Sequence, residues 1–283
     1  MAKKKIAWVT DSTAYISKEL AENPDVYVLP LGIIFDNEVF EDGVDLSVQE
    51  LYTRIRNDKE VPKTSQPSVG KFAELYEKLK EEYEHAIAVH ISSKLSGTLD
   101  SSTSGKNMAE FNVEVVDSLS MSHAITSLIY KGIELADKGM SATEVADRLR
   151  ETAKRGENYI LLGNLDQFYK GGRMSGTQYL LGNILKIKPI IRINTNGEFE
   201  LFERVRSEKK AITRMIDLLK NSYEKNTIHQ VQIMHGNVFD KAAELKELIQ
   251  VQFPDLDIFI GEISSTIAVH AGEGTLAILW HNE

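Results

Sequence analysis

Short apolar runs alternate with amphipathic stretches through the first half of the chain. The runs are nearly continuous in apolar character, which is typical of strands in a parallel sheet covered on both faces. Strands are predicted at residues 6–9, 26–34, 86–91 and 113–116. Helical spacing or propensity lies between them, at 46–56, 69–84 and 101–110. This alternation predicts a three-layer α/β/α domain with a mainly parallel sheet over residues 1–156.

From residue 159 the pattern changes. Two apolar strands, predicted at 189–193 and 199–205, flank Asn196-Gly197, a dipeptide typical of a β-hairpin turn. Further strands are predicted at 159–162, 231–234, 258–263 and 276–280, with helices at 209–219 and 239–251. Adjacent antiparallel strands mixed with helices predict a second α/β domain with a mixed sheet over residues 157–283. We expect the boundary between the domains within 154–158.

Polar residues follow three of the predicted N-terminal strands. The segments are Thr10-Asp11-Ser12-Thr13, Ser92-Ser93-Lys94-Leu95-Ser96-Gly97-Thr98 and Asp117-Ser118. In open α/β sheets, ligands bind in the crevice outside the carboxyl ends of the strands. Hydroxyls and helix-start N–H groups in such a crevice are good donors for an anion. Ser, Thr and Asp are also the preferred helix N-caps, so capping is the alternative interpretation of each single loop.

A further hydroxyl-rich segment, Thr64-Ser65-Gln66-Pro67-Ser68, lies between two predicted helices and is interpreted as a loop. Pro67 fixes the backbone, and Ser68 suits the N-cap of the helix that follows. These local roles leave Thr64 and Ser65 unexplained. We therefore expect this loop to hold a ligand.

His270 is the histidine best placed for a ligand. It lies just before the last predicted strand, beside Gly272 and Gly274, where backbone can approach a bound molecule. A lone histidine is more often structural, and His90, inside an apolar run, is interpreted as a core residue.

Composition narrows the function classes. The chain has 283 residues, of which 42% are hydrophobic and 27% charged, so it can bury a substantial core. Its net charge of −9 argues against a nucleic-acid-binding surface. It has no Cys, which excludes disulfides and thiolate chemistry. No apolar segment approaches the roughly 18 residues of a membrane span, so we expect a cytoplasmic protein without stable membrane insertion.

Neither a metal site nor a cofactor is expected. The acidic residues of segment 36–45 lack EF-hand spacing, and an acidic surface turn is the preferred interpretation. A Ser or Thr nucleophile needs a base within hydrogen-bond reach. His270 with Asp11 or Asp117 would complete a triad in principle, but nothing in the spacing favours that assembly. Binding without catalysis is the simpler hypothesis.

The ordered set of motifs resembles the DegV family over nearly the whole chain. The set comprises Thr10-Asp11-Ser12, segment 64–68, Ser96-Gly97-Thr98, Val116-Asp117-Ser118, Gly171-Gly172-Arg173 and His270 with the glycines that follow it. The resemblance implies a two-domain protein that binds one long-chain fatty acid between its domains. It also implies a partner, a fatty acid kinase subunit, to which the bound carboxylate is presented for acyl phosphate formation.

The resemblance assigns roles residue by residue. The carboxylate site that it implies consists of Thr64, Ser65, Ser96, Gly97, Thr98 and His270. Arg173, with Arg204 or Arg206, would lie near the mouth and contact the kinase. Leu99-Asp100 departs from the usual aromatic and amide pair at this point, which affects the shape of that wall.

Two alternative functions stay open. One is a hydrolase or phosphotransferase that uses His270 with a Ser or Thr and needs no partner. The other is a regulatory module that senses a lipid or another small carboxylate.

Overall fold

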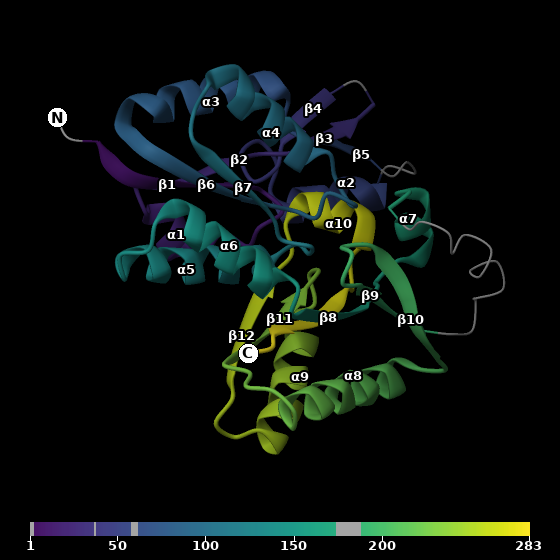
Figure 1. The fold of residues 1–283 in the computed structure, drawn as a ribbon. Coiled ribbons are helices and arrows are strands. Elements are labelled where there is room, and N and C mark those ends of the chain that lie inside the picture. Colours follow the sequence, from purple (N-terminus) through teal and green to yellow (C-terminus); the bar gives the residue numbers. More distant parts are fainter. Residues whose placement is uncertain (1–2, 37, 58–61, 174–187) are drawn as a thin grey trace.

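The structure is a computed structural model that describes residues 3–36, 38–57, 62–173 and 188–283. The described residues form three sheets, and the apolar runs predict most strands of the two larger ones (Figure 1). The first two confirm the predicted fold class: a parallel sheet in the N-terminal half and a mixed sheet in the C-terminal half. The predicted boundary at residue 156 stays a prediction, although the C-terminal sheet takes its first strand from Gly156 onward.

The N-terminal sheet is entirely parallel. Its strands, in spatial order, are β2 (Val26–Leu29), β1 (Lys4–Asp11), β6 (Tyr83–His90) and β7 (Val113–Asp117). Side chains alternate between its faces, as the period of two requires. Val9 and Ala88 pack beneath α3 (Val69–Glu82) and α4 (Thr98–Ala109). Trp8 and Val89 pack against helices on the opposite face.

Those opposite helices are α5 (His123–Asp137) and α6 (Ala142–Ala153), and Figure 1 shows them below the sheet. The remaining short elements are α1 (Lys18–Glu22) and α2 (Val48–Asn57). Helices on both faces explain why the strands read as continuous apolar runs. The three-layer prediction is confirmed.

A small antiparallel sheet was not predicted. It consists of β4 (Glu38–Glu41), β3 (Gly32–Phe35) and β5 (Lys63–Ser65). The predicted single strand 26–34 is wrong, because the chain leaves the parallel sheet at Pro30 and enters this one. Pro30 lies between the two strands, and a residue without a backbone N–H is disfavoured inside a continuous strand. The prediction of a loop at 64–68 is also wrong for its first residues, which pair with β3.

The acidic segment that precedes α2 is not simply a surface turn. Asp36 and Asp45 are exposed, but Asp42 is 4% exposed and accepts a hydrogen bond from the backbone N–H of Thr266 at 3.2 Å. Burial raises the pKa of Asp42. This carboxyl group therefore connects the small sheet to the C-terminal half.

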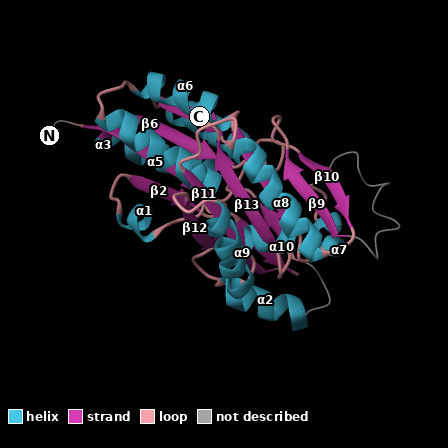
Figure 2. Cartoon of the chain, turned by 90° about the horizontal axis from the view of Figure 1, so that it is seen from below, coloured by secondary structure: helices cyan, strands magenta, loops and turns pink. Residues whose placement is uncertain are grey.

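The C-terminal sheet is mixed, and its order departs from chain order. Its strands are β10 (Phe199–Val205), β9 (Lys188–Ile193), β8 (Gly156–Leu161), β13 (Leu276–His281), β11 (Gln230–His235) and β12 (Asp257–Glu262). All neighbours are antiparallel except β11 and β12. Figure 2 shows α8 (Glu208–Tyr223) and α9 (Phe239–Gln252) lying across one face.

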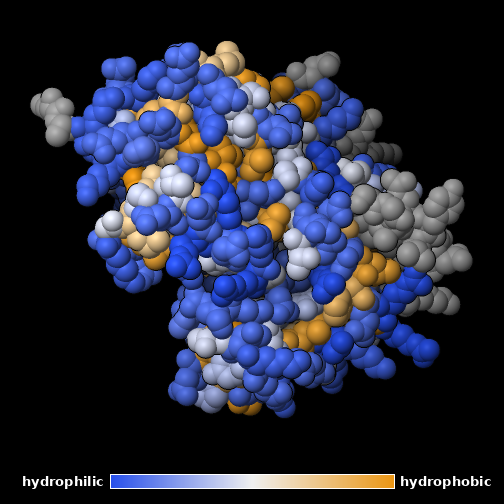
Figure 3. Space-filling view, viewed as in Figure 1, coloured by the Kyte–Doolittle hydropathy of each residue, from blue (hydrophilic) through white to orange (hydrophobic). Residues whose placement is uncertain are grey.

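The opposite face of this sheet meets the N-terminal half. Ile160, Ala277 and Leu279 on that face belong to the same buried cluster as Trp8 and Val89. Two short helices, α7 (Leu165–Lys170) and α10 (Ser265–Ala271), lie at this junction. Figure 3 shows that the face seen in this view is largely hydrophilic, with smaller apolar patches. Among the described residues, no helix combines the length and hydrophobicity needed to cross a membrane.

Candidate functional site

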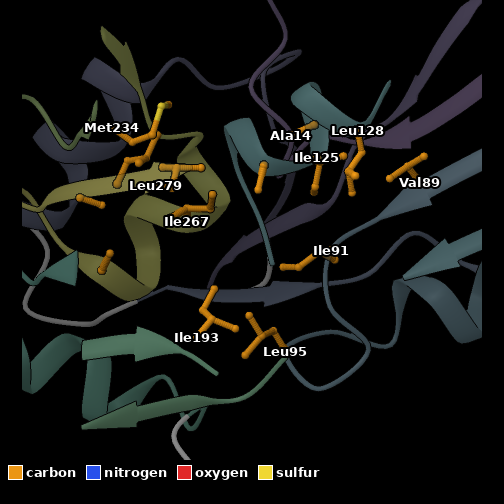
Figure 4. Close-up of a cluster of buried hydrophobic side chains, with 14 of the residues drawn as sticks. Ala14, Val89, Ile91, Leu95, Ile125, Leu128, Ile193, Met234, Ile267 and Leu279 are labelled. Carbon is orange, nitrogen blue, oxygen red and sulfur yellow. The ribbon is translucent and has the colours of Figure 1, made fainter. Parts of the chain in front are cut away.

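A cavity lies between the C-terminal sheet and the N-terminal half. Most of its wall is apolar, with side chains from both halves. Figure 4 shows Ile91 and Leu95 from the N-terminal half near Ile193, with Met234, Ile267 and Leu279 nearby. Such a wall suits an aliphatic ligand.

The apolar wall is interrupted by a group of polar side chains from separate elements. Thr64 and Ser65 come from β5, Ser96 from the loop before α4, His270 from α10, and Arg173 follows α7. All five are half-buried, so they border the cavity while remaining partly accessible to solvent. The structure thus brings together four of the six residues that the DegV resemblance assigned to a carboxylate, and adds Arg173.

Thr64 and His270 are joined across the two halves. The Thr64 Oγ1 atom lies 2.8 Å from His270 Nε2, and Arg173 Nη2 donates to the same oxygen at 3.5 Å. His270 Nδ1 is buried and has no hydrogen-bond partner among the described residues. A buried N–H without a partner is rarer than a buried lone pair without one, so we assign the proton to Nε2. Nε2–H then donates to Thr64 Oγ1, and the hydroxyl hydrogen of Thr64 is left for a ligand.

The electrostatics of this end favour an anion. Burial, together with the positive charge of Arg173, lowers the pKa of His270 to about 3. Burial also lowers the pKa of Arg173, but a guanidinium stays charged at neutral pH. The group therefore offers one fixed positive charge and several donors without a carboxylate of its own.

The position of His270 is set by contacts at the end of α10. The side-chain amide of Gln167, on α7, donates to the backbone oxygens of Ala268 and Val269 at 3.0 and 2.5 Å. Gly171 places its backbone against the imidazole, because a Cβ atom there would lie 2.4 Å from His270 Nδ1. Gln167 carries no signal in the sequence, since a polar residue inside a short helix follows no pattern of its own.

The sequence predicted that the backbone at Gly272 and Gly274 would approach a bound molecule, but neither glycine borders the cavity. Gly272 has a φ of +81°, and a Cβ atom there would lie 2.6 Å from the Cβ atom of Asn164. Gly163 lies within 3.5 Å of the Cβ position at Gly274, whose φ is +93°. These glycines allow close packing of the turn against the end of β8. They act on the ligand site only by fixing the backbone around His270.

The loop before α4 packs directly against segment 64–66. Ser96 Oγ lies 2.9 Å from Thr98 Oγ1 and accepts from the Thr98 backbone N–H at 3.3 Å. A Cβ atom at Gly97 would lie 2.8 Å from the Gln66 side-chain nitrogen, so a larger residue would separate the two loops. Gly97 and Thr98 do not border the cavity, and Thr98 is fully buried. Their contacts shape the loop that presents Ser96.

The other polar segments at strand ends mainly connect loops to one another. Asp11 accepts from the backbone N–H groups of Thr13 and Ile91, each at 3.0 Å, and contacts His90 Nδ1 at 3.0 Å. Asp117 accepts from the backbone N–H groups of Ser93 and Leu119 at 3.2 and 2.8 Å. Neither carboxylate is hydrogen-bonded to His270, so the triad considered from sequence does not form. His90 lies in the core, as interpreted.

The arginines assigned to partner contact are separated. Arg204 and Arg206 are exposed at the end of β10 and do not border the cavity, whereas Arg173 does. Whether these three residues contact a partner stays a prediction. No group of three or more potential metal ligands occurs in the described part of the chain.

The fold and the cavity define a two-domain α/β protein built around an apolar cavity with a polar, cationic end. A sequence model of the DegV family matches residues 5–283, and the chain therefore belongs to the DegV family.

Relatives and solved structures agree over almost the full length. A DegV domain-containing protein of Halalkalibacterium halodurans is 34% identical over 282 residues, which cover 99% of each chain. The fatty acid binding DegV family protein of Streptococcus agalactiae has a TM-score of 0.93 at 29% identity, covering 100% of both chains. DegV of Bacillus subtilis, described as a fatty acid binding protein, has a TM-score of 0.89 at 32% identity, covering 99% of both.

Proposed function

We propose that this protein binds one long-chain fatty acid, with the acyl chain in the apolar cavity and the carboxylate at Thr64, Ser65, Ser96 and His270. The observation that carries the proposal is an apolar cavity that ends in hydroxyls, an imidazole and a guanidinium. The fatty acid binding described for the relatives from Streptococcus agalactiae and Bacillus subtilis supports it. In this arrangement Arg173 supplies the charge that balances the carboxylate.

The acyl chain and the carboxylate contribute different amounts to the free energy of binding. Burying about 15 methylenes contributes on the order of 10 kcal/mol at about 0.8 kcal/mol each. Each charge-assisted hydrogen bond contributes about 1.5–3 kcal/mol, much of which offsets the desolvation of the carboxylate. The tail therefore supplies affinity, while the polar end fixes which atoms of the ligand face the mouth.

The polar end is a poor catalyst on its own. A general base works best when its pKa lies near the working pH, whereas the pKa of His270 is lowered to about 3. The carboxylates that would orient it, Asp11 and Asp117, are hydrogen-bonded within other loops. These features favour a carrier over a hydrolase or phosphotransferase.

The carrier presents its ligand to a fatty acid kinase subunit. The kinase transfers the γ-phosphoryl group of ATP to a carboxylate oxygen, which yields the acyl phosphate and ADP. Partial exposure of Thr64, Ser65 and Ser96 supports this role, because a carboxylate held by these groups stays reachable from solvent. Arg173, Arg204 and Arg206 are the proposed contacts with the kinase.

Native mass spectrometry of the purified protein, followed by organic extraction, tests lipid binding. We expect one fatty acid per chain, and palmitate or oleate should bind to delipidated protein. Failure to find lipid in any preparation, together with no binding of either added acid, would contradict the proposal. The carrier role is tested separately, by adding a fatty acid kinase and ATP and trapping acyl phosphate as the hydroxamate. A protein that binds lipid but supports no trapping would leave the sensor hypothesis.

A further inference from the structure

The C-terminal sheet contains a slot where two neighbouring strands separate. β8 and β9 are paired at Leu161 with Ile190 and at Ile160 with Ile191. Continuing the same antiparallel register would place Asn158 opposite Ile193, but no backbone pair forms there. Beyond that point the two strands line pockets instead of a ladder. Residues 156–158 line one side of this gap, and residues 193–195 line the other.

The side chain of Asn158 bridges this slot. Its Oδ1 atom accepts from the backbone N–H of Ile193 at 2.6 Å, and its Nδ2 atom donates to the backbone oxygen of Ile193 at 3.2 Å. The amide thus takes the place of the missing ladder bonds. Asn158 is 8% exposed, so its hydrogen bonds are well shielded from water. A side chain in this position closes the sheet locally.

Three pockets meet at this bridge. The ligand cavity, a small pocket and an outer pocket are all lined by Asn158 and Ile193. The outer pocket is mainly polar, with Arg155, Glu157 and Arg192 at its wall. The bridge therefore separates an apolar space from a polar one.

The bridge also lies at one end of a row of cavity-lining side chains. Leu162, Ile160 and Asn158 alternate along one face of the chain, and Leu162 leads directly into the turn that packs against α10. Four residues of strand correspond to about 13 Å, which is the length of this row from Leu162 to Asn158. An acyl chain that follows the row away from Leu162 is directed toward the amide.

We propose that Asn158 is a specificity-determining residue that limits acyl chain length by closing the slot between β8 and β9. This inference rests on the proposed function, because it assumes that the cavity holds an acyl chain. The amide resists a longer chain in two ways. It fills the slot, and any methylene that displaced it would leave the N–H and oxygen of Ile193 without partners.

The experiment compares wild-type protein with Asn158→Ala in equilibrium binding of palmitate, stearate, arachidate and behenate. Each methylene that becomes buried raises affinity about fourfold. We expect wild-type affinity to stop rising within this series, and the variant to continue rising for at least one further acid. In a crystal structure of the variant with arachidate, the terminal carbons should lie between residues 156–158 and 193–195.

Three comparisons make the result decisive. Asn226→Ala removes another amide that bonds a backbone oxygen, away from the cavity, and should leave the wild-type profile unchanged. Ile263→Ala thins the wall where the cavity adjoins a different groove. The inference is overturned if affinity continues to rise with chain length only in Ile263→Ala. It is also overturned if Asn158→Ala and wild type show the same dependence of affinity on chain length. If Asn158→Ala does not fold, Asn158→Ser replaces it and should show the same extension to a smaller degree.

The outcomes also separate this inference from the proposed function. If wild-type protein binds none of the four acids, the proposed function fails, and the inference fails with it. If wild-type protein binds the acids and Asn158→Ala has the same chain-length profile as wild type, fatty acid binding stands and the role of Asn158 is refuted.

Discussion

Two histidines, His90 and His270, each contact a hydroxyl group, but one lies in the core and the other at the cavity. His90 lies in the N-terminal core, where its ring nitrogens contact Asp11 and Ser102, each at 3.0 Å, and where all three residues are fully buried. His270 lies at the cavity, with Thr64 on one nitrogen and no partner on the other among the described residues. The first set resembles a catalytic triad in composition, yet none of its members lines the ligand cavity.

Polar groups that lack a hydrogen-bond partner within the described protein, and not residue type alone, distinguish the candidate site from the core. Around His90 every polar group is paired, so nothing is left for a ligand. Around His270 the hydroxyl hydrogen of Thr64 is left for a ligand, one ring nitrogen has no partner among the described residues, and the guanidinium of Arg173 borders the cavity. Variants in the two regions should therefore change different properties.

The largest expected effect is the loss of stability in Asp11→Ala. The substitution leaves the buried N–H groups of Thr13 and Ile91 and the ring of His90 without their acceptor. We expect the free energy of unfolding to fall by about 3 kcal/mol or more in urea denaturation. His270→Ala loses one hydrogen bond at a cavity wall and should cost about 1 kcal/mol. Equal losses in the two variants would contradict the comparison.

The pH dependence of stability should carry the signature of His270. An unfolded histidine has a pKa of about 6.5, whereas burial lowers that of His270 to about 3. Between these values the unfolded chain binds more protons, so the free energy of unfolding falls as the pH drops from about 6.5 toward about 3. His123 and His281, whose pKa values burial lowers to about 4, contribute in the same direction.

The measurement is the slope of unfolding free energy against pH in wild type and in His270→Ala. The slope should be smaller in the variant but not zero, because the other two histidines remain. A bound fatty acid should also reduce the slope in wild type, since a carboxylate beside His270 favours the charged imidazole. An unchanged slope in His270→Ala would refute the assignment.

Thr64→Val tests the polar end without changing its shape. Removing the hydroxyl should slow kinase-dependent acyl phosphate formation about tenfold, because the carboxylate loses a charge-assisted hydrogen bond and its orientation. Retention of the lipid should fall less, since the tail supplies most of the affinity. Ser102→Ala is the matched control, because it removes a hydroxyl that contacts the other histidine. A Ser102 variant with slower acyl transfer and normal stability would break the comparison.

Ser96→Ala should have the smallest effect. Ser96 shares its hydroxyl with Thr98 and with the start of α4, so a ligand gains only part of its hydrogen-bonding capacity. We expect roughly a two- to fivefold decrease in acyl transfer, measured in the same trapping assay. A loss larger than that of Thr64→Val would reverse the proposed ranking of the two hydroxyls.

Apolar patterning predicted three strands of the N-terminal sheet because burial on both faces leaves little choice of residue. The runs around Val9, Ala88 and Val116 correspond to β1, β6 and β7. The break at Pro30 was missed because two apolar strands follow one another without a polar gap. Helices α5 and α6 were missed as well, although Ser141 and Glu144 form a capping box at the start of α6.

The polar residues of the candidate site could be predicted from the sequence, whereas the cavity that they border could not. Thr64, Ser65, Ser96 and His270 are conspicuous as hydroxyls and an imidazole in short polar segments. Asn158 and Gln167 carry no such signal, because each acts through backbone groups that only the folded chain brings near. Apolar cavity walls and apolar core residues look the same in sequence, so the cavity itself needed the structure.

The last strand of the chain, β13, lies in the middle of the C-terminal sheet, between β8 and β11. During synthesis, β8 and β11 are made before the strand that joins them, and the face that carries Ala277 and Leu279 is absent until the end. The C-terminal half therefore has to finish folding after translation has passed residue 281. The cavity wall that Ala277 and Leu279 form is therefore incomplete in a nascent chain, and we expect uptake of a ligand to follow the completion of β13.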